Sequence, residues 1–353
     1  MNKVRPVYID RIAHVSALGL SVFEATESLL AGKKNLSEYS LLGESWPWFA
    51  LPIEEEGWTA RARRALGLLA GEFTAGEPSD SLQDLPFFVG SSSNGIGEFE
   101  TLARVTGVVA LPVDDSVVFG REIQAAFGCK AMPWMFFTAC SSGLAALEAA
   151  STLIACGEID EAVVLGVDFG CNTVFAGFVS LNLLTRTEEG SGLILGEAAA
   201  GLRLTAQPGP GWRIAACRLC IDSYSATLPT PDGRVIAANI AAALDEAGLA
   251  AQAIDIVKPN RNGLPAIDEA ENAALDFVFG SRRPPEISFK RQFGHTLGAS
   301  GPAELTALLA LADTPAWQAC HGLPHRLLLN FVGFGGSTVA LVIERCPDPG
   351  DCP

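Results

Sequence analysis

A single cysteine, Cys140, lies where a strand-like stretch gives way to a helical pattern. Pro133 to Phe137 is apolar, and the run from Gly143 to Ala155 is rich in alanine and leucine. This order places the thiol at a helix N-terminus, where free backbone N–H groups and the helix dipole favour the thiolate. Nearby N–H groups are also placed to receive the oxyanion that forms when sulfur attacks a carbonyl. We therefore predict a nucleophilic cysteine, with an inert buried thiol as the alternative.

Polar groups on glycine-containing loops recur in the C-terminal half. Lys290 and His295 lie in the run Ser288–Gly301, directly before a helical pattern. A histidine held there donates to a carbonyl oxygen from a fixed position, and a lysine holds a carboxylate or a hydrogen-bonded network. A capped structural histidine is the alternative. The run Lys258–Glu271 is a turn-rich loop that opens a helix, and Asn330–Ser337 holds a glycine turn that brings backbone close to another group.

The composition of the 353-residue chain fits a globular enzyme. Hydrophobic residues make up 49% and charged residues 18%, which indicates burial in α/β layers or in a subunit interface and argues against disorder. The formal net charge of −16 does not favour a nucleic-acid binder. An acidic partner would need a local basic patch, because the overall field repels it.

Nine cysteines are scattered along the chain, and only Cys217 and Cys220 form a CxxC pair. No second pair completes a zinc site, so we expect no metal. An odd number without a framework indicates reduced thiols, and we predict a cytoplasmic protein. The opening residues Met1–Tyr8 show no signal-peptide pattern. The uncharged run Leu327–Ile343 is broken by Asn330 and by glycines, which predicts strand, turn and strand instead of a membrane span.

Apolar periodicity predicts strands that alternate with helices, as in an α/β protein with buried sheets. The expected helices are Ser21–Ala31, Trp58–Phe73, Glu122–Phe127, Gly143–Ala155, Ala237–Ala247, Ile267–Phe279 and Pro302–Leu311. The expected strands are Val7–Leu18, Leu85–Gly90, Pro133–Phe137, Glu161–Val167, Gly192–Leu204 paired with Trp212–Ile221, Ile254–Val257, and a final hairpin of Leu327–Phe331 with Ser337–Glu344. The pattern partly restarts near residue 205, which favours two similar halves, residues 1–205 and 206–353.

These clusters, in this order and at these separations, resemble the motifs of the β-ketoacyl-acyl carrier protein synthases, a family of condensing enzymes with the thiolase fold. The run Thr138–Gly143 matches the family's nucleophile motif residue for residue, and Gly333–Gly336 is similar to its terminal glycine turn. Further matches are Val15–Gly19, Ala176–Phe178 and Gly196–Glu197. The resemblance covers nearly the whole chain and implies two similar βαβ halves in a five-layer αβαβα arrangement.

Catalytic roles are also implied by the resemblance. Cys140 takes an acyl group as a thioester. His295, with Asn260, polarises an incoming malonyl thioester so that loss of carbon dioxide generates a carbanion. Lys290 positions His295 and its network, and Glu304 supports them.

An oxyanion hole and a pantetheine channel complete the site in the family. The N–H groups of Cys140 and Phe334 correspond to the oxyanion hole, and the Phe334 side chain corresponds to a gate. Asn262 and Leu264 stand where two threonines normally touch the phosphopantetheine arm.

Three departures from the family pattern bear on the reaction. The usual HGTGTP loop appears here as Asn260–Pro265, so that Asn260 replaces the first catalytic histidine. Related enzymes that begin fatty-acid chains use cysteine, histidine and asparagine together, and asparagine still offers a donor to the enolate oxygen. The segment Leu184–Gly192 is shorter than usual, and Ser225 stands where elongating members often carry a histidine.

The leading hypothesis is a β-ketoacyl synthase-like condensing enzyme of fatty-acid or type II polyketide synthesis. As an acyltransferase it would receive acyl groups on the phosphopantetheine of an acyl carrier protein or on coenzyme A, with no metal or redox cofactor. It would form a dimer with itself or with a homologous ketosynthase. The alternative is a catalytically weak or inactive chain-length-factor-like partner of a heterodimeric ketosynthase, for example of the aryl-polyene type, although such partners commonly lose the cysteine. A thioesterase-like or acyl-transferase use of the thiol is a third hypothesis.

Overall fold

The computed structural model describes residues 4–55, 57–78, 80–107 and 115–347, so Cys352 lies outside the described residues. The strands are β1 (Val7–Ser16), β2 (Ser37–Leu41), β3 (Glu44–Phe49), β4 (Phe87–Gly90), β5 (Trp134–Phe136), β6 (Glu161–Asp168), β7 (Leu195–Gly196), β8 (Ala198–Thr205), β9 (Trp212–Ile221), β10 (Ile256–Lys258), β11 (Arg326–Val332) and β12 (Ser337–Arg345). The α-helices are α1 (Val22–Leu30), α2 (Trp58–Thr74), α3 (Ile96–Thr106), α4 (Asp115–Phe127), α5 (Ser142–Cys156), α6 (Asn172–Ser180), α7 (Arg234–Ala247), α8 (Pro265–Phe279), α9 (Lys290–Phe293), α10 (Ser300–Ala312) and α11 (Pro315–His321). Short 3₁₀ turns are η1 (Ala139–Ser141), η2 (Ala251–Ala253), η3 (Leu297–Ala299) and η4 (Phe334–Gly336).

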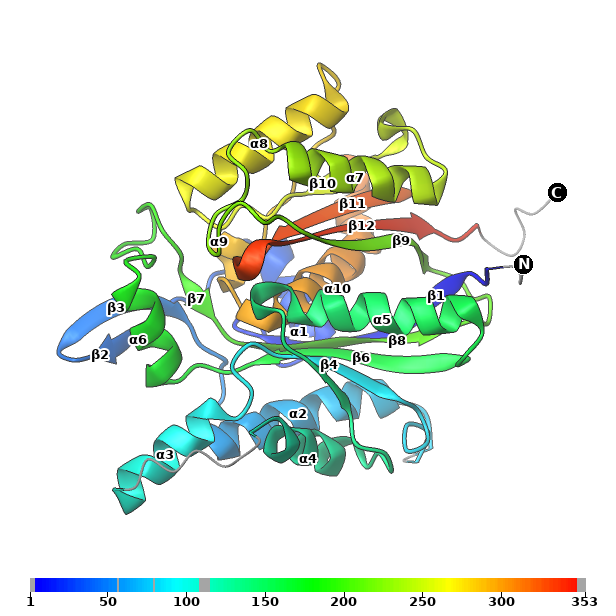
Figure 1. Ribbon diagram of the computed structural model, residues 1–353. Coiled ribbons are helices and arrows are strands. Elements are labelled where there is room, and N and C mark those ends of the chain that lie inside the picture. The colour runs from blue at the N-terminus through cyan, green and yellow to red at the C-terminus, as the bar shows by residue number, and fades with distance from the viewer. Residues whose placement is uncertain (1–3, 56, 79, 108–114, 348–353) are drawn as a thin grey trace.

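Helices and sheet alternate in five layers (Figure 1). Helices α7 and α8 cover one outer face, followed by strands β10, β11, β12 and β9. Helices α5 and α10 fill the middle layer, and strands β1, β8, β6 and β4 separate them from α2 and α4 on the other outer face. The expected five-layer αβαβα arrangement is confirmed.

The two strand layers repeat one topology. In the N-terminal layer the order is β1-β8-β6-β4-β5, and in the C-terminal layer it is β9-β12-β11-β10. In both layers the first strand lies beside the last strand and antiparallel to it. An isolated parallel bridge joins Val257 of β10 to Glu286. This bridge occupies the position beside β10 that β5 occupies beside β4 in the N-terminal layer. The expected boundary at residue 205 falls between β8 and β9, and the division into residues 1–205 and 206–353 stays a prediction.

The expected pairing of Gly192–Leu204 with Trp212–Ile221 is wrong. β8 pairs with β1 and β6, while β9 pairs with β1 and β12, so that β1 lies between them. The connection between β8 and β9 contains two prolines and two glycines in residues 206–211. Six residues easily span the two inter-strand spacings, about 10 Å, needed to step over β1.

The two central helices touch through glycine. A Cβ atom on Gly143 of α5 would lie 2.5 Å from Pro302 Cδ and 2.8 Å from Gly298 O. Since Gly298 and Pro302 belong to η3 and α10, this close approach brings the nucleophile turn next to the loop that carries His295.

One run, Ala139–Cys156, is long and apolar enough to cross a membrane by length and composition alone. It consists of η1 and α5, and 61% of it is buried inside the protein. Because α5 packs between β4 and β6 on one side and β9 on the other, its apolar surface belongs to the core.

Candidate active site

The turn that holds Cys140 has a locked backbone. Ala139 adopts the left-handed conformation, with φ of 51°. The Ser142 hydroxyl accepts from Thr138 N–H at 2.9 Å and donates to Ala139 O at 2.6 Å. These bonds close the turn between β5 and α5, so that the sulfur stands at the start of α5, as the sequence predicts.

Two backbone N–H groups, those of Cys140 and Phe334, interact with the Cys140 sulfur and lower its pKa. The positive charge of Lys290 acts in the same direction. Burial outweighs them and raises the pKa of the thiol to about 11. The backbone N–H groups thus favour the thiolate, as the sequence predicts, while burial acts more strongly against it. The two N–H groups that the sequence assigned to an oxyanion hole do lie together.

His295 lies against the thiol. Its Nε2 is 3.0 Å from Cys140 Sγ, and its Nδ1 is 3.4 Å from the Ser300 hydroxyl. Its main chain is fixed on both sides, because its N–H donates to Ile194 O at 2.7 Å and its carbonyl accepts from Gly196 N–H. Burial, with the positive charges of Lys290 and Lys258, lowers its pKa well below 6.5. The imidazole is neutral and is placed to take the thiol proton when sulfur attacks.

Glu304 lies between two lysines. Lys290 Nζ pairs with one carboxylate oxygen and Lys258 Nζ with the other. All three side chains are buried. The family resemblance implies that Glu304 supports Lys290 and His295, and it assigns nothing to Lys258. Its signal was a lysine at the end of an otherwise apolar strand, immediately before the Asn260 loop.

The Asn260 loop is held by one buried carboxylate. The N–H groups of Asn260 and Arg261 donate to Glu271 at 2.6 and 3.2 Å, and the Asn330 amide donates to the same carboxylate. Among the described residues the Nδ2 of Asn260 has no hydrogen-bond partner, although the side chain is buried. A buried amide N–H₂ without a partner is costly, which makes it a donor available to a ligand oxygen.

The two candidate pantetheine contacts behave differently. Asn262 Oδ1 accepts from Leu264 N–H at 3.0 Å, so its oxygen is used within its own loop. Asn262 lines a cavity of about 30 Å³ together with Gly263, Lys290 and His295. The Leu264 side chain instead packs against the apolar cluster under α7 and α8. The structure thus places one candidate beside the histidine and the other in an apolar contact.

A buried carboxylate that the sequence analysis missed stands behind the nucleophile. Asp168, at the end of β6, accepts from the N–H groups of Ser92, Ser93 and Gly298 at 3.0, 2.9 and 2.7 Å. It ties the loop after β4 to η3, and its negative charge raises the pKa of Cys140. The donors are 75 to 130 residues away, so no local pattern marks them.

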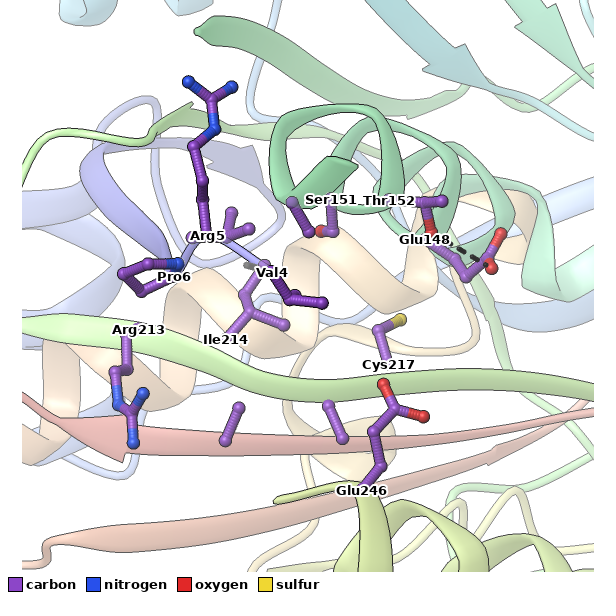
Figure 2. A pocket seen from close by; sticks show the side chains of 14 residues that line it. Val4, Arg5, Pro6, Glu148, Ser151, Thr152, Arg213, Ile214, Cys217 and Glu246 are labelled. Carbon is purple, nitrogen blue, oxygen red and sulfur yellow. Dashed lines mark hydrogen bonds between the residues drawn. The ribbon is translucent and has the colours of Figure 1, made fainter. Parts of the chain in front are cut away.

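A second cysteine provides a contrast. Figure 2 shows Cys217 of β9 at a cavity of about 490 Å³ lined by α5, β9 and the N-terminal segment. Burial and the charges of Glu148 and Glu246 all raise the pKa of Cys217. Because nearby carboxylates disfavour a thiolate, we do not expect Cys217 to be nucleophilic. In the described part of the chain no three His, Cys, Asp or Glu side chains group as a metal site, and the eight cysteines found there are free.

The chain is similar to known ketosynthases in sequence. The N-terminal domain model of β-ketoacyl synthase matches residues 74–207, and the C-terminal domain model matches residues 213–321. The 3-oxoacyl-[acyl-carrier-protein] synthase 2 of Mycobacterium bovis is 26% identical over 323 residues, which cover 77% of each chain. The spectinabilin polyketide synthase system protein NorA' of Streptomyces orinoci is 30% identical over 72% of this chain and 7% of its own length.

Solved structures support the same fold. The complex of the ketosynthase ApeO with its chain length factor ApeC from Xenorhabdus doucetiae contains a chain that matches with a TM-score of 0.83 and 23% identity, over 97% of this chain and 98% of that one. A type II polyketide ketosynthase–carrier complex, AntDE:AntF, matches with a TM-score of 0.84 and 18% identity, over 98% and 100% of the two chains. These structures share the thiolase fold with this chain. The chain belongs to the β-ketoacyl synthase family, whose members are acyltransferases.

Proposed function

We propose that Cys140 accepts an acyl group from a carrier thioester and that the site condenses this group with a malonyl thioester. One observation carries the proposal: His295 Nε2 lies 3.0 Å from Cys140 Sγ. The backbone N–H groups of Cys140 and Phe334 at the same sulfur support it. A nucleophile, a neutral base and an oxyanion hole are the parts that acyl transfer to a thiol requires.

Acyl transfer begins with a proton shift. His295 Nε2 takes the Cys140 proton as sulfur attacks the thioester carbonyl, and the oxyanion is received by the N–H groups of Cys140 and Phe334. When the intermediate collapses, the carrier sulfur leaves and takes the proton from His295. The products are the Cys140 thioester and a free carrier thiol, so the site returns to a neutral imidazole.

Condensation uses the same histidine as a donor. The carbonyl oxygen of the malonyl thioester receives hydrogen bonds from His295 and from the Asn260 amide while carbon dioxide leaves. The resulting carbanion attacks the carbonyl carbon of the Cys140 thioester, the bond from that carbon to sulfur breaks, and the released thiolate takes up a proton from water. Each step uses the chain's own groups and the phosphopantetheine of a carrier protein or coenzyme A, so the scheme needs no metal or redox cofactor.

The partners we propose are an acyl carrier protein and a second ketosynthase-like subunit, in the cytoplasm. The net charge of −16 would repel an acidic carrier, and a local basic patch overcomes this. Arg261 and Arg291 line the small cavity beside His295 together with Glu188, and we propose these two arginines as part of such a patch. The eight free cysteines support a reducing compartment.

A second candidate function is the chain-length-factor-like partner subunit. Asn260 at the position of the first catalytic histidine favours it, as does the raised pKa of the buried Cys140 thiol. Two similar structures are ketosynthase complexes with chain length factors, the ApeO–ApeC complex and the ishigamide complex. If this protein is the chain-length-factor-like subunit, the active site of the associated ketosynthase holds the growing acyl group.

Intact-protein mass spectrometry after mixing with short, medium and aromatic acyl carrier proteins tests the proposal. We expect an acyl adduct that disappears in Cys140→Ala and persists in Cys217→Ala, the matched control. If no donor labels this chain, alone or in a complex whose partner ketosynthase is labelled, the partner-subunit function replaces the catalytic one.

A further inference from the structure

A second lysine stands beside the lysine that the family motif supplies. Lys258 ends β10, and its side chain is 0% exposed. Its ammonium group pairs with Glu304 and lies 3.4 Å from the centroid of the Phe331 ring. Burying an ammonium group is expensive, and burial lowers the pKa of Lys258 to about 8. The cost of burying this charge indicates that it acts on neighbouring groups.

Two lysines share one carboxylate in this cluster. Lys258 and Lys290 both bind Glu304, whose side chain is 1% exposed. Glu271 also lies within electrostatic reach of Lys258, and its carboxylate accepts from N–H groups of Asn260, Arg261 and Asn330. Glu271 offsets the charge of Lys258 from outside the Lys258–Glu304–Lys290 cluster, and the three groups bound directly to one another carry one net positive charge.

The Lys258–Glu304–Lys290 cluster lies near the imidazole of His295. Ser300, which contacts His295 Nδ1, and Glu304 are four residues apart on α10 and thus share one face of the helix. Four residues correspond to about 6 Å along the helix axis, so Glu304 and the lysines that it binds lie about one helical turn from Ser300. Lys290 also lines the small cavity next to His295.

Ionisable groups of several elements act on His295 or on the groups next to it. Cys140 of η1 contacts its Nε2, and the charges of Lys290 of α9 and Lys258 of β10 act on the ring. Glu304 of α10 binds both lysines, and Asp168 at the end of β6 accepts from Gly298 N–H, three residues after His295. Asp168 is saturated by hydrogen bonds from the loop after β4 and from η3. No other described lysine or arginine is paired with Glu304.

We propose that Lys258 is a positioning residue that, bound to Glu304 beside Lys290, adds a buried positive charge near His295 and so opposes a further positive charge on the imidazole. The ring then stays a neutral acid–base group and does not form an ion pair with Cys140. Given the proposed function, this keeps His295 able both to take the thiol proton and to donate to the malonyl carbonyl. Asparagine at position 260 leaves His295 as the only imidazole of the motif, which makes its protonation state decisive.

Histidine-selective ¹³C NMR titration of the intact protein tests this directly, because the chain has only four histidines. The variants are Lys258→Met and Lys258→Gln, with Lys258→Arg as the charge-conserving rescue and Lys130→Met as a surface control. In the neutral variants Glu304 keeps Lys290 as a partner, so we expect them to fold. We expect the His295 resonance to titrate about 1 pH unit higher in both, and to stay at its wild-type position in Lys258→Arg and Lys130→Met.

An unchanged His295 titration in a folded Lys258→Met or Lys258→Gln protein would overturn the proposal. A Lys258→Arg protein that titrates like Lys258→Met would do the same. The readout needs no substrate, so it stands even if Cys140 is never acylated. Where Cys140 is acylated, the acid limb of malonyl decarboxylation should move up by the same amount in the neutral variants.

Discussion

Cys140 and His295 form an uncharged pair at rest, and this has a chemical consequence. A free thiolate so close to a carrier thioester would also meet other electrophiles, whereas a buried thiol becomes nucleophilic only while its proton moves to His295. The two N–H groups at the sulfur are then free to follow the negative charge to the carbonyl oxygen. In the proposed reaction the same residues would thus serve both the resting state and the transition state.

Restoring histidine at position 260 tests the enolate donors. Asn260→His should preserve or raise malonyl decarboxylation, because histidine offers a stronger donor to the same oxygen. Asn260→Ala, which removes the donor, should cost on the order of 2–4 kcal/mol in activation free energy. Decarboxylation is measured by release of labelled carbon dioxide. The enolate role of this loop is wrong if Asn260→Ala and His295→Ala both leave the rate unchanged.

His14 should make the folded protein sensitive to acid. It is buried between Ser16 and Thr306, and burial lowers its pKa to about 4. Between pH 6.5 and 4 the unfolded chain binds a proton at this site and the folded chain does not, so stability falls as pH falls. The loss amounts to about 3 kcal/mol by pH 4. Urea unfolding at several pH values gives the free energy of unfolding as a function of pH. Between pH 6.5 and 4 this free energy should fall less steeply for His14→Gln than for wild type. His321→Gln, at an exposed position, should match wild type.

At the scale of elements, amphipathic helices and apolar strands follow from the sequence pattern. The structure has α1, α2, α7, α8, α10 and the terminal β11–β12 hairpin within a few residues of the expected bounds. The hairpin of β2 and β3 was missed because its turn residues, Leu42 and Gly43, both have positive φ without the usual Asn-Gly signal. The helix α6 was missed because its sequence, Asn172–Ser180, has no clear polar face.

The motif residues of the site were predictable, and their charged surroundings were not. The turn of Cys140 and the loop of His295 are local sequence features that the fold brings within 3.0 Å. Lys258, Asp168 and Glu271 act through hydrogen bonds and ion pairs to segments elsewhere in the chain. Such pairs depend on how layers stack, and composition says nothing about them.

A single methyl group added where α5 contacts α10 should destabilise the protein. Gly143→Ala would place Cβ 2.8 Å from a backbone oxygen, Gly298 O, and should cost about 1–3 kcal/mol of folding free energy. It should also slow Cys140 acylation, because it pushes the nucleophile turn away from His295. Gly71→Ala, in an exposed part of α2 with nothing within 4 Å of the new atom, should stabilise the protein by about 0.4–1 kcal/mol. Denaturant unfolding measures the free energy of unfolding of both variants. Equal values would contradict the prediction, because they would show that α5 and α10 move apart to admit the methyl group.

At the scale of the whole molecule, the sheet ends next to the nucleophile. β5 is the last strand of its layer and pairs only with β4 among the described strands. Its surroundings expose large apolar side chains, with Trp134 59% and Phe137 50% exposed. An open apolar edge of this kind invites pairing with another chain. We expect it to be the centre of the proposed dimer, with a second copy or with a homologous ketosynthase.

A charge on this edge should separate the subunits. Trp134→Lys places an ammonium group where strands would pair, and should weaken self-association, or association with a co-expressed ketosynthase, at least ~100-fold. Phe277→Lys replaces an even more exposed aromatic, 84% exposed on α8, and should leave the dimer intact. Sedimentation equilibrium at micromolar concentration distinguishes the two. Because β5 ends four residues before Cys140, the separated Trp134→Lys chain should also lose acylation. A wild-type monomer that is fully active alone would defeat both the homodimer and the heterodimer.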